Sequence, residues 1–267
     1  MIRQAKVAGQ FYSGDKETLG AEVASLVTEG AKKEKAIAIM CPHAGYIYSG
    51  AVAGAVYSRL EFPDTLILIG PNHTGLGTRL SIMAGGRWEI PTGSFDVDEE
   101  TAAKLLQLYP LLTDEPQAHL FEHSLEVQLP FIAHFSSSAK IVPIAVMGAS
   151  LDECHLLGQS MAAAIGQSKK SVTIVTSSDM SHYISDSAAR HKDNMAIEKI
   201  LALDPEGLYD VAKRERITMC GLLPATVMLY AARVLGAKSA ELVKYATSAE
   251  VSGDYGHVVG YAGVIIT

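Results

Sequence analysis

Residues 36–50 read AIAIMCPHAGYIYSG. This stretch decides the fold class because its apolar run ends abruptly at residues that can take part in chemistry. The small and branched apolar residues are typical of a buried strand. Cys41 and Pro42 end the run, and His43 follows directly, with a glycine two positions later. A buried strand that ends in a polar side chain and a glycine turn is the usual way in which an α/β enzyme builds a site.

The rest of the chain repeats this pattern, because short runs rich in Val, Ile and Leu alternate with segments of helical period. We expect strands near residues 36–41, 65–70, 141–147, 172–177 and 258–266, and helices near 16–28, 50–60, 98–108, 123–135, 151–166, 188–203, 206–213 and 221–234. This order predicts an α/β fold with a central, largely parallel or mixed β-sheet flanked by helices. No linker, repeat or low-complexity segment interrupts the pattern, so we expect one domain over residues 1–267.

The composition limits the classes of function. The chain has 22 Lys and Arg against 29 Asp and Glu, which gives a net charge of −7. This sign argues against binding to nucleic acid or to anionic membranes, because both need a positive face. Without a signal peptide or an apolar run of membrane-spanning length, a cytoplasmic protein is expected. Three widely spaced cysteines indicate reduced thiols rather than a disulfide framework.

Histidines follow three of the expected strands. The second strand closes as IGPNH with His73, and the run VTIVTSSDMSH closes with Asp179 and His182. Ligands bind outside the carboxyl ends of strands in open α/β sheets, so we predict that His43, His73 and His182 converge at one edge. The alternative for each is a solvated loop residue or a partly buried core residue. A phosphate cradle is not indicated, because neither glycine-rich signature follows a strand.

Cys220 lies in RITMCGLLPATVML, where the apolar spacing predicts a helix from about Gly221. A thiol at a helix N-terminus is expected to have a lowered pKa. Two imidazoles and one thiolate on separate loops would make a three-ligand metal site with an open position. The alternative is an ordinary buried thiol. We expect Cys41 to pack inside its strand and Cys154 to be structural or on the surface.

The segment EHSLEVQLP, with its helical period, places Glu122 and Glu126 four residues apart on one face, beside His123. Paired carboxylates suit acid–base chemistry, but like charges at this spacing are unfavourable, so at least one should be paired or buried. Capping and packing at a helix start is an equal alternative. We expect Glu122 and His123 at the pocket edge as substrate-orienting groups. Four histidines are expected to be ordinary surface or helix residues: His119, His134, His155 and His191.

A series of motifs covers nearly the whole chain. They are AGQFY (8–12), PHAGYIYSG (42–50), GPNH (70–73), WEIPTG (88–93), EHSLEVQLPF (122–131), SSDMSH (177–182) and CG (220–221). In this order they resemble the MEMO family, also called protein B of the AmmeMemoRadiSam system. That family is similar in fold to the class III extradiol ring-cleavage dioxygenases, whose iron lies between two histidines and a glutamate.

The resemblance implies that His43 and His73 are metal ligands and that Cys220 is the third, where the dioxygenases carry a carboxylate. It also implies that His182 is the acid/base residue, with Asp179 beside it. Because a thiolate is softer than a carboxylate, it shifts the preference towards copper or zinc without excluding iron. The expected cofactor is a divalent metal, iron first, in an iron- or copper-dependent oxidoreductase that acts on a small molecule or peptide.

Two alternatives use the same pocket. Eukaryotic members of the family are associated with phosphotyrosine peptides and redox signalling, which predicts binding without turnover. Phosphate recognition usually needs an arginine cluster or a helix N-terminus. The basic residues nearest the motifs do not group in the sequence: Arg79, Arg87, Arg214 and Arg216. Zinc-dependent hydrolysis would need a general base, for which Asp179 or Glu122 could serve. The resemblance further implies functional association with radical-SAM and AMMECR-type proteins.

Overall fold

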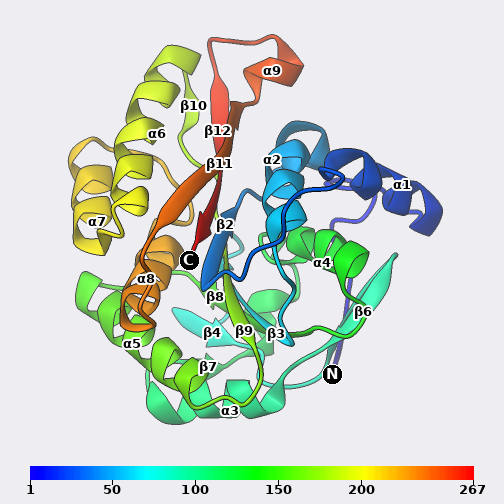
Figure 1. Ribbon diagram of the computed structural model, residues 1–267, viewed down its shortest axis with the longest axis vertical. Coiled ribbons are helices and arrows are strands. Elements are labelled where there is room, and N and C mark those ends of the chain that lie inside the picture. Colours follow the sequence, from blue (N-terminus) through cyan, green and yellow to red (C-terminus); the bar gives the residue numbers. More distant parts are fainter.

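A computed structural model describes residues 1–267, and its centre is a mixed β-sheet with helices on both sides (Figure 1). Four parallel strands lie side by side in the middle of this sheet: β2 (Ala38–Cys41), β9 (Val172–Ser177), β3 (Thr65–Pro71) and β8 (Lys140–Val146). The sheet is extended at its two ends by β12 (Val258–Ile266), β11 (Ala240–Thr247) and β10 (His182–Ile184), and by β4 (Leu80–Ile82) and β7 (Thr113–Asp114). The prediction of an α/β fold with a central mixed sheet is confirmed.

The helices cover the two faces of this sheet. They are α1 (Lys16–Leu26), α2 (Tyr46–Arg59), α3 (Glu99–Leu108), α4 (Leu129–Phe135), α5 (Leu151–Gly166), α6 (Asp186–Leu201), α7 (Pro205–Arg214), α8 (Leu222–Val234) and α9 (Ala249–Ser252). In Figure 1, α5 to α8 lie on one side of the sheet and α2 and α4 on the other. Because both faces are covered, every residue of β3 is buried. A contiguous core of 65 buried residues fills the space between these layers.

The five strands expected from apolar runs are all present. A second small sheet of β1 (Ile2–Gln4), β5 (Arg87–Ile90) and β6 (Gly93–Asp96) was not expected, because its strands are short. β11 was also missed. It pairs only with β12 and leaves most of its length partly exposed, so charged residues interrupt its apolar pattern.

One expected helix is wrong at its start. The helix predicted from residue 123 begins instead with the 3-10 turn η2 (Glu126–Gln128) and continues as α4, with Pro130 in its first turn. Another short turn, η1 (Pro116–His119), precedes this region. Residues 120–125 therefore form a loop, and the helical spacing assumed for Glu122 and Glu126 does not apply.

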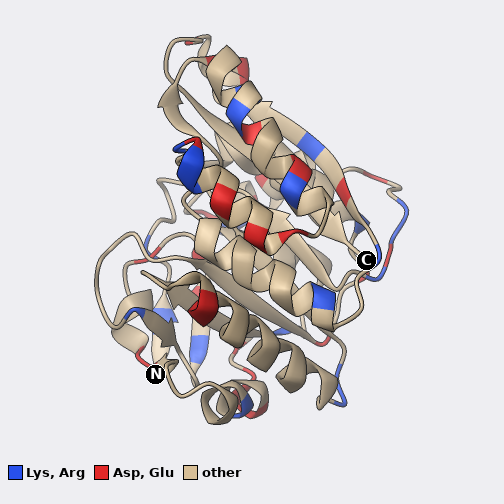
Figure 2. Cartoon of the chain, turned by 90° about the vertical axis from the view of Figure 1, so that its left-hand side faces the viewer, with Lys and Arg blue, Asp and Glu red and all other residues tan.

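Charged side chains are mixed on the surface of the molecule. Figure 2 shows positions of Lys and Arg interspersed with positions of Asp and Glu along the visible helices, without a long run of basic positions. None of the helices combines the length and the apolar character needed to cross a bilayer.

Candidate metal centre

The carboxyl ends of β2, β9 and β3 form the floor of the candidate site. These strands are neighbours and run parallel, so the loops that follow them emerge at one edge of the sheet. His43 follows β2 and His73 follows β3, and their ring centroids are 5.2 Å apart. The structure therefore brings these two sequence-predicted histidines together.

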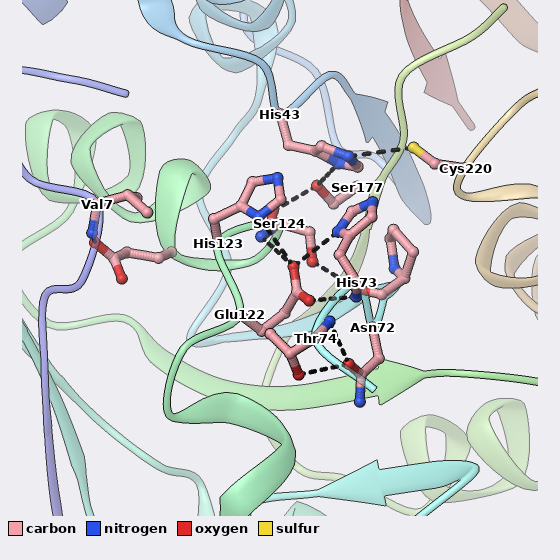
Figure 3. A network of polar contacts seen from close by, with 12 residues as sticks. Val7, His43, Asn72, His73, Thr74, Glu122, His123, Ser124, Ser177 and Cys220 are labelled. Carbon is pink, nitrogen blue, oxygen red and sulfur yellow. Dashed lines mark hydrogen bonds and ion pairs between the residues drawn. The ribbon is translucent and has the colours of Figure 1, made fainter. Parts of the chain in front are cut away.

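A third imidazole, from His123, completes the cluster (Figure 3). It stacks on His73, with ring centroids 4.7 Å apart and 23° between the planes, and it meets His43 edge-on at 5.4 Å. One potential ligand atom from each of the three rings lies within 4.8 Å of the other two. This group of histidines could hold a metal ion, since imidazole nitrogens are common ligands of transition metals.

Glu122 lies beneath two of these imidazoles and is fully buried, instead of standing at the pocket edge. Its Oε1 is 3.0 Å from His73 Nδ1 and 3.4 Å from His123 Nδ1, and it also accepts the Ser124 amide. Burial alone would raise the pKa of Glu122, but the hydrogen bonds from His73 and Ser124 lower that pKa to about 2. The carboxylate is ionised and can only accept, so His73 donates Nδ1–H and keeps Nε2 free.

Ser177, the last residue of β9, fixes the tautomer of His43. The Ser177 hydroxyl donates to the Ser124 carbonyl at 2.6 Å, which uses its single proton. It therefore accepts from His43 Nδ1 at 2.9 Å and from Gln128 Nε2 at 3.0 Å. Burial and the neighbouring His123 and His73 lower the pKa of His43. His43 is thus a neutral imidazole whose Nε2 lone pair faces the site.

Cys220 contacts His43 at the nitrogen that Ser177 leaves free, with Sγ 3.2 Å from Nε2 (Figure 3). Typical bonds to zinc of about 2.1 Å from nitrogen and about 2.3 Å from sulfur would separate these donors by about 3.1 Å at a right angle and about 3.6 Å at the tetrahedral angle that zinc prefers. The observed spacing therefore fits two ligands of one ion. The thiol nevertheless lies outside the group of three imidazoles whose donor atoms are all mutually close.

The expected effect of the helix N-terminus on Cys220 is wrong. Helix α8 begins at Leu222, directly after its N-cap Gly221, but burial and the charge of Asp179 raise the pKa of the Cys220 thiol. The Asp179 amide donates to Sγ at 3.3 Å and acts in the opposite direction. The raised pKa follows because the site is enclosed, and desolvation outweighs the dipole.

A close approach between two backbones requires glycine at position 221. A Cβ at this position would lie 2.4 Å from Ser178 Cβ, which no side chain allows. The Gly221 amide instead donates to Ser178 Oγ at 3.0 Å. This contact holds the Cys220 loop against the end of β9.

Asp179 and His182 lie near the cluster but do not contact each other through a hydrogen bond or ion pair. Asp179 Oδ1 accepts the His43 amide at 2.8 Å, and burial raises the pKa of this carboxyl to about 6. His182 Nδ1 is 2.9 Å from the Thr218 carbonyl, so it donates there and leaves Nε2 free. The structure places Asp179 as an anchor of the His43 loop, and any influence on His182 is electrostatic.

Glu126 faces away from the imidazoles, so the predicted pairing with Glu122 on one helical face is wrong. It is fully buried and forms an ion pair with Arg3. Its Oε1 also accepts the amide of Val7 at 3.0 Å and the Tyr12 hydroxyl at 2.6 Å. Glu126 therefore fastens the N-terminal segment to the loop that carries the site.

The N-terminal segment, residues 3–12, supports the candidate site from outside. Arg3 donates to the carbonyl of Glu122 at 2.8 Å and to that of His119 at 2.9 Å. Phe11 packs on the ring of His123, with centroids 4.7 Å apart. No sequence pattern predicted this contact, because the partners lie more than a hundred residues apart.

His119 is not the ordinary surface or helix residue that was expected. It is fully buried, its ring meets Trp88 edge-on, and neither ring nitrogen has a hydrogen-bond partner. Burial, followed by the charge of Arg3, lowers the pKa of His119 to about 3. The other three are exposed on helices as predicted: His134, His155 and His191. Cys41 and Cys154 are both buried.

Three of the four arginines near the motifs form separate ion pairs instead of a phosphate-binding cluster, and Arg216 forms no ion pair. Arg79 pairs with Glu153, Arg87 with Asp96, and Arg214 with Glu215. Each of these three guanidinium groups is already matched by an acidic side chain from its own neighbourhood. The phosphopeptide alternative gains no support from these residues.

Sequence comparisons match nearly the whole chain. A family model described as Memo-like protein matches residues 3–265. A MEMO1 family protein of Aquifex aeolicus (strain VF5) is 43% identical over 266 residues, which cover 99% of this chain and 98% of that protein. MEMO1 family proteins of Methanosarcina acetivorans and Ignicoccus hospitalis are 41% and 39% identical, each over 99% of this chain.

Proposed function

This chain belongs to the Memo-like protein family, and from that premise we propose that it is a metal-binding protein with an oxidoreductase centre. In this proposal His43, His73 and Cys220 hold a divalent metal ion. Iron is the first choice because the related fold uses it, and the thiolate keeps copper and zinc as alternatives. The observation that carries the proposal is the 3.2 Å spacing between His43 Nε2 and Cys220 Sγ beside a cluster of three imidazoles.

The hydrogen bonds around the imidazoles support this assignment. Metal-binding histidines usually donate their second N–H to a carboxylate or another acceptor, which fixes the tautomer. His73 has Glu122 in this role and His43 has Ser177. A metal ion bound here would supply Lewis-acid or redox chemistry.

In the proposed mechanism His182 moves a proton to or from the bound substrate. Its Nδ1–H is engaged by the Thr218 carbonyl, so its Nε2 remains available as an acceptor. Asp179 holds the amide of His43 and, through its own amide, contacts the sulfur of Cys220. Asp179 therefore keeps two of the proposed ligands in place.

The proposed substrate site is an open pocket of about 730 Å³ between the N-terminal segment and the start of α2, which none of the clustered imidazoles lines and which Phe11 separates from His123. Phe11, Ile47 and Tyr48 contribute to its lining, and Phe11 also packs on His123. Its size and apolar wall suit a small molecule or a short peptide. Association with radical-SAM and AMMECR-type proteins is part of the same proposal and rests on the family alone.

The first experiment is elemental analysis of protein purified without added metal, followed by anaerobic reconstitution with Fe(II), copper and zinc. We expect about one equivalent of metal in the wild type, and loss of binding in His43→Ala. His134→Gln, which changes an exposed histidine on α4, serves as the control and should bind like the wild type. If Cys220→Ala leaves both metal stoichiometry and affinity unchanged, the proposed ligand set is wrong. Replacement of His182 should preserve metal binding and reduce turnover.

A further inference from the structure

His123 lies beside His73 over the same carboxylate, although only His73 belongs to the proposed ligand set. His73 Nδ1 donates a hydrogen bond to Glu122 Oε1 at 3.0 Å, and His123 Nδ1 lies 3.4 Å from the same oxygen without forming a hydrogen bond. Glu122 is fully buried, so a single carboxylate orients both rings from below. The two rings are stacked with 23° between their planes, so their Nε2 atoms are on the same side, away from Glu122.

His43 faces these two rings almost equally. Its ring centroid is 5.2 Å from that of His73 and 5.4 Å from that of His123, and both contacts are edge-on, at 73° and 84°. The stacked pair of His73 and His123 therefore faces His43 across the site. Their potential donor atoms lie within 4.8 Å of one another. Two nitrogens that bind one ion at about 2.1 Å are at most about 4.2 Å apart, so the rings move closer together when they share an ion.

His123 is also held in place from its outer side. Phe11 packs on its ring, and Arg3 fixes the carbonyl of the preceding residue, Glu122. Contacts with Phe11 and His73 keep the His123 ring beside the other imidazoles and reduce the side-chain freedom that is lost on binding a ligand.

We propose that His123 is a metal ligand, so that the centre has a face of three imidazoles, His43, His73 and His123, to which Cys220 adds a fourth donor beside His43. This inference rests on the proposed metal-binding function and extends its ligand set. Three neutral imidazoles suffice to hold zinc, copper or iron without a thiolate. The centre can therefore retain metal when Cys220 is replaced, although it then lacks the thiolate, its softest ligand.

The test measures metal binding in wild type, His123→Gln, Cys220→Ser and the double variant, with His134→Gln as the matched histidine control. Affinity for Co(II) is measured by titration, and coordination by the sulfur-to-cobalt absorption band. We expect His123→Gln to weaken binding at least tenfold while keeping the sulfur band. Cys220→Ser should lose the band but retain one equivalent, and the double variant should lose stoichiometric binding.

A second measurement counts the imidazoles directly. In Cu(II)-loaded Cys220→Ser, electron spin-echo envelope modulation should report three bound imidazoles. This measurement leaves His123 itself unchanged. Two bound imidazoles in this variant would overturn the inference. So would a metal affinity that His123→Gln leaves unchanged both in the wild type and in Cys220→Ser. Loss of all metal in Cys220→Ser alone would also overturn it. These outcomes leave the proposed function intact, whereas a wild type that binds no metal would refute the function itself.

Discussion

Glu122 and Glu126 are four residues apart and both fully buried, yet they stabilise different parts of the molecule. Glu122 orients the imidazoles of His73 and His123, whereas Glu126 binds Arg3 and the backbone of the N-terminal segment. Their spacing in the sequence predicted that the two carboxylates lie on one helical face and act together. The role of each carboxylate is therefore decided by the residues that contact it in the fold and not by its spacing in the sequence. The predictions below test this division of roles between Glu122 and Glu126.

The largest expected effect is on the free energy of unfolding of Glu126→Gln. The change leaves Arg3 as a buried cation without its partner and weakens the acceptor for the Val7 amide and the Tyr12 hydroxyl. Breaking a buried ion pair in this way costs about 3–5 kcal/mol. Urea unfolding of the metal-free protein measures it. A loss below about 1 kcal/mol would contradict the assigned role of Glu126.

The second prediction concerns Glu122→Gln, which should act mainly on metal binding. Loss of the carboxylate that orients a ligating histidine typically lowers metal affinity by about 10- to 100-fold. We expect a decrease in this range by metal titration, with a smaller loss of stability than in Glu126→Gln. If Glu126→Gln is still folded and weakens metal binding more than Glu122→Gln does, the division between the two carboxylates fails.

The third prediction concerns the pH dependence of stability that comes from His119, whose backbone carbonyl accepts a hydrogen bond from Arg3. The pKa of His119 is lowered to about 3, so this imidazole stays neutral in the folded protein while the unfolded chain takes up a proton below about pH 6.5. Stability is therefore complete above pH 6.5 and is lost as the pH falls towards 3. At pH 5 this single group costs about 2 kcal/mol.

His119→Phe tests this acid sensitivity because neither ring nitrogen has a partner to lose. Unfolding measured between pH 7.5 and 5 should show a shallower decline than in the wild type, by about 2 kcal/mol at pH 5. His134→Gln is the control and should follow the wild-type curve. An unchanged pH dependence in His119→Phe would assign the acid sensitivity to other groups, such as His43 and His123, whose pKa values are also lowered.

The smallest expected effect comes from a third carboxylate, Glu153, at the start of α5. It forms a capping box with Ser150 and pairs with Arg79 at the surface. Removal of such a partly exposed cap costs about 1 kcal/mol or less. Glu153→Gln should therefore lower stability slightly and leave metal affinity unchanged, which gives the reference for the two buried positions. A loss comparable to that of Glu126→Gln would show that burial does not govern these effects.

Much of the site could be predicted because it depends on where buried strands end. Apolar runs located β2, β3 and β9, and the parallel order then brought His43 and His73 together. The contacts of Arg3 could not be predicted, because no periodic pattern links residue 3 to residues 119–126. The stacking of His123 on His73 could not be predicted either, because the segment was interpreted as helical and the structure has a loop there that turns the ring towards His73.

The position of β9 between β2 and β3 has a consequence for the emergence of the chain from the ribosome. All three clustered imidazoles are synthesised before residue 124, but the strands that carry two of them cannot take their final places until residues 172–177 have been inserted between them. Metal captured earlier would meet an unfinished arrangement of donors. Loading with the proposed metal ion would therefore belong to a late stage of the protein's maturation, after Cys220 has also been synthesised.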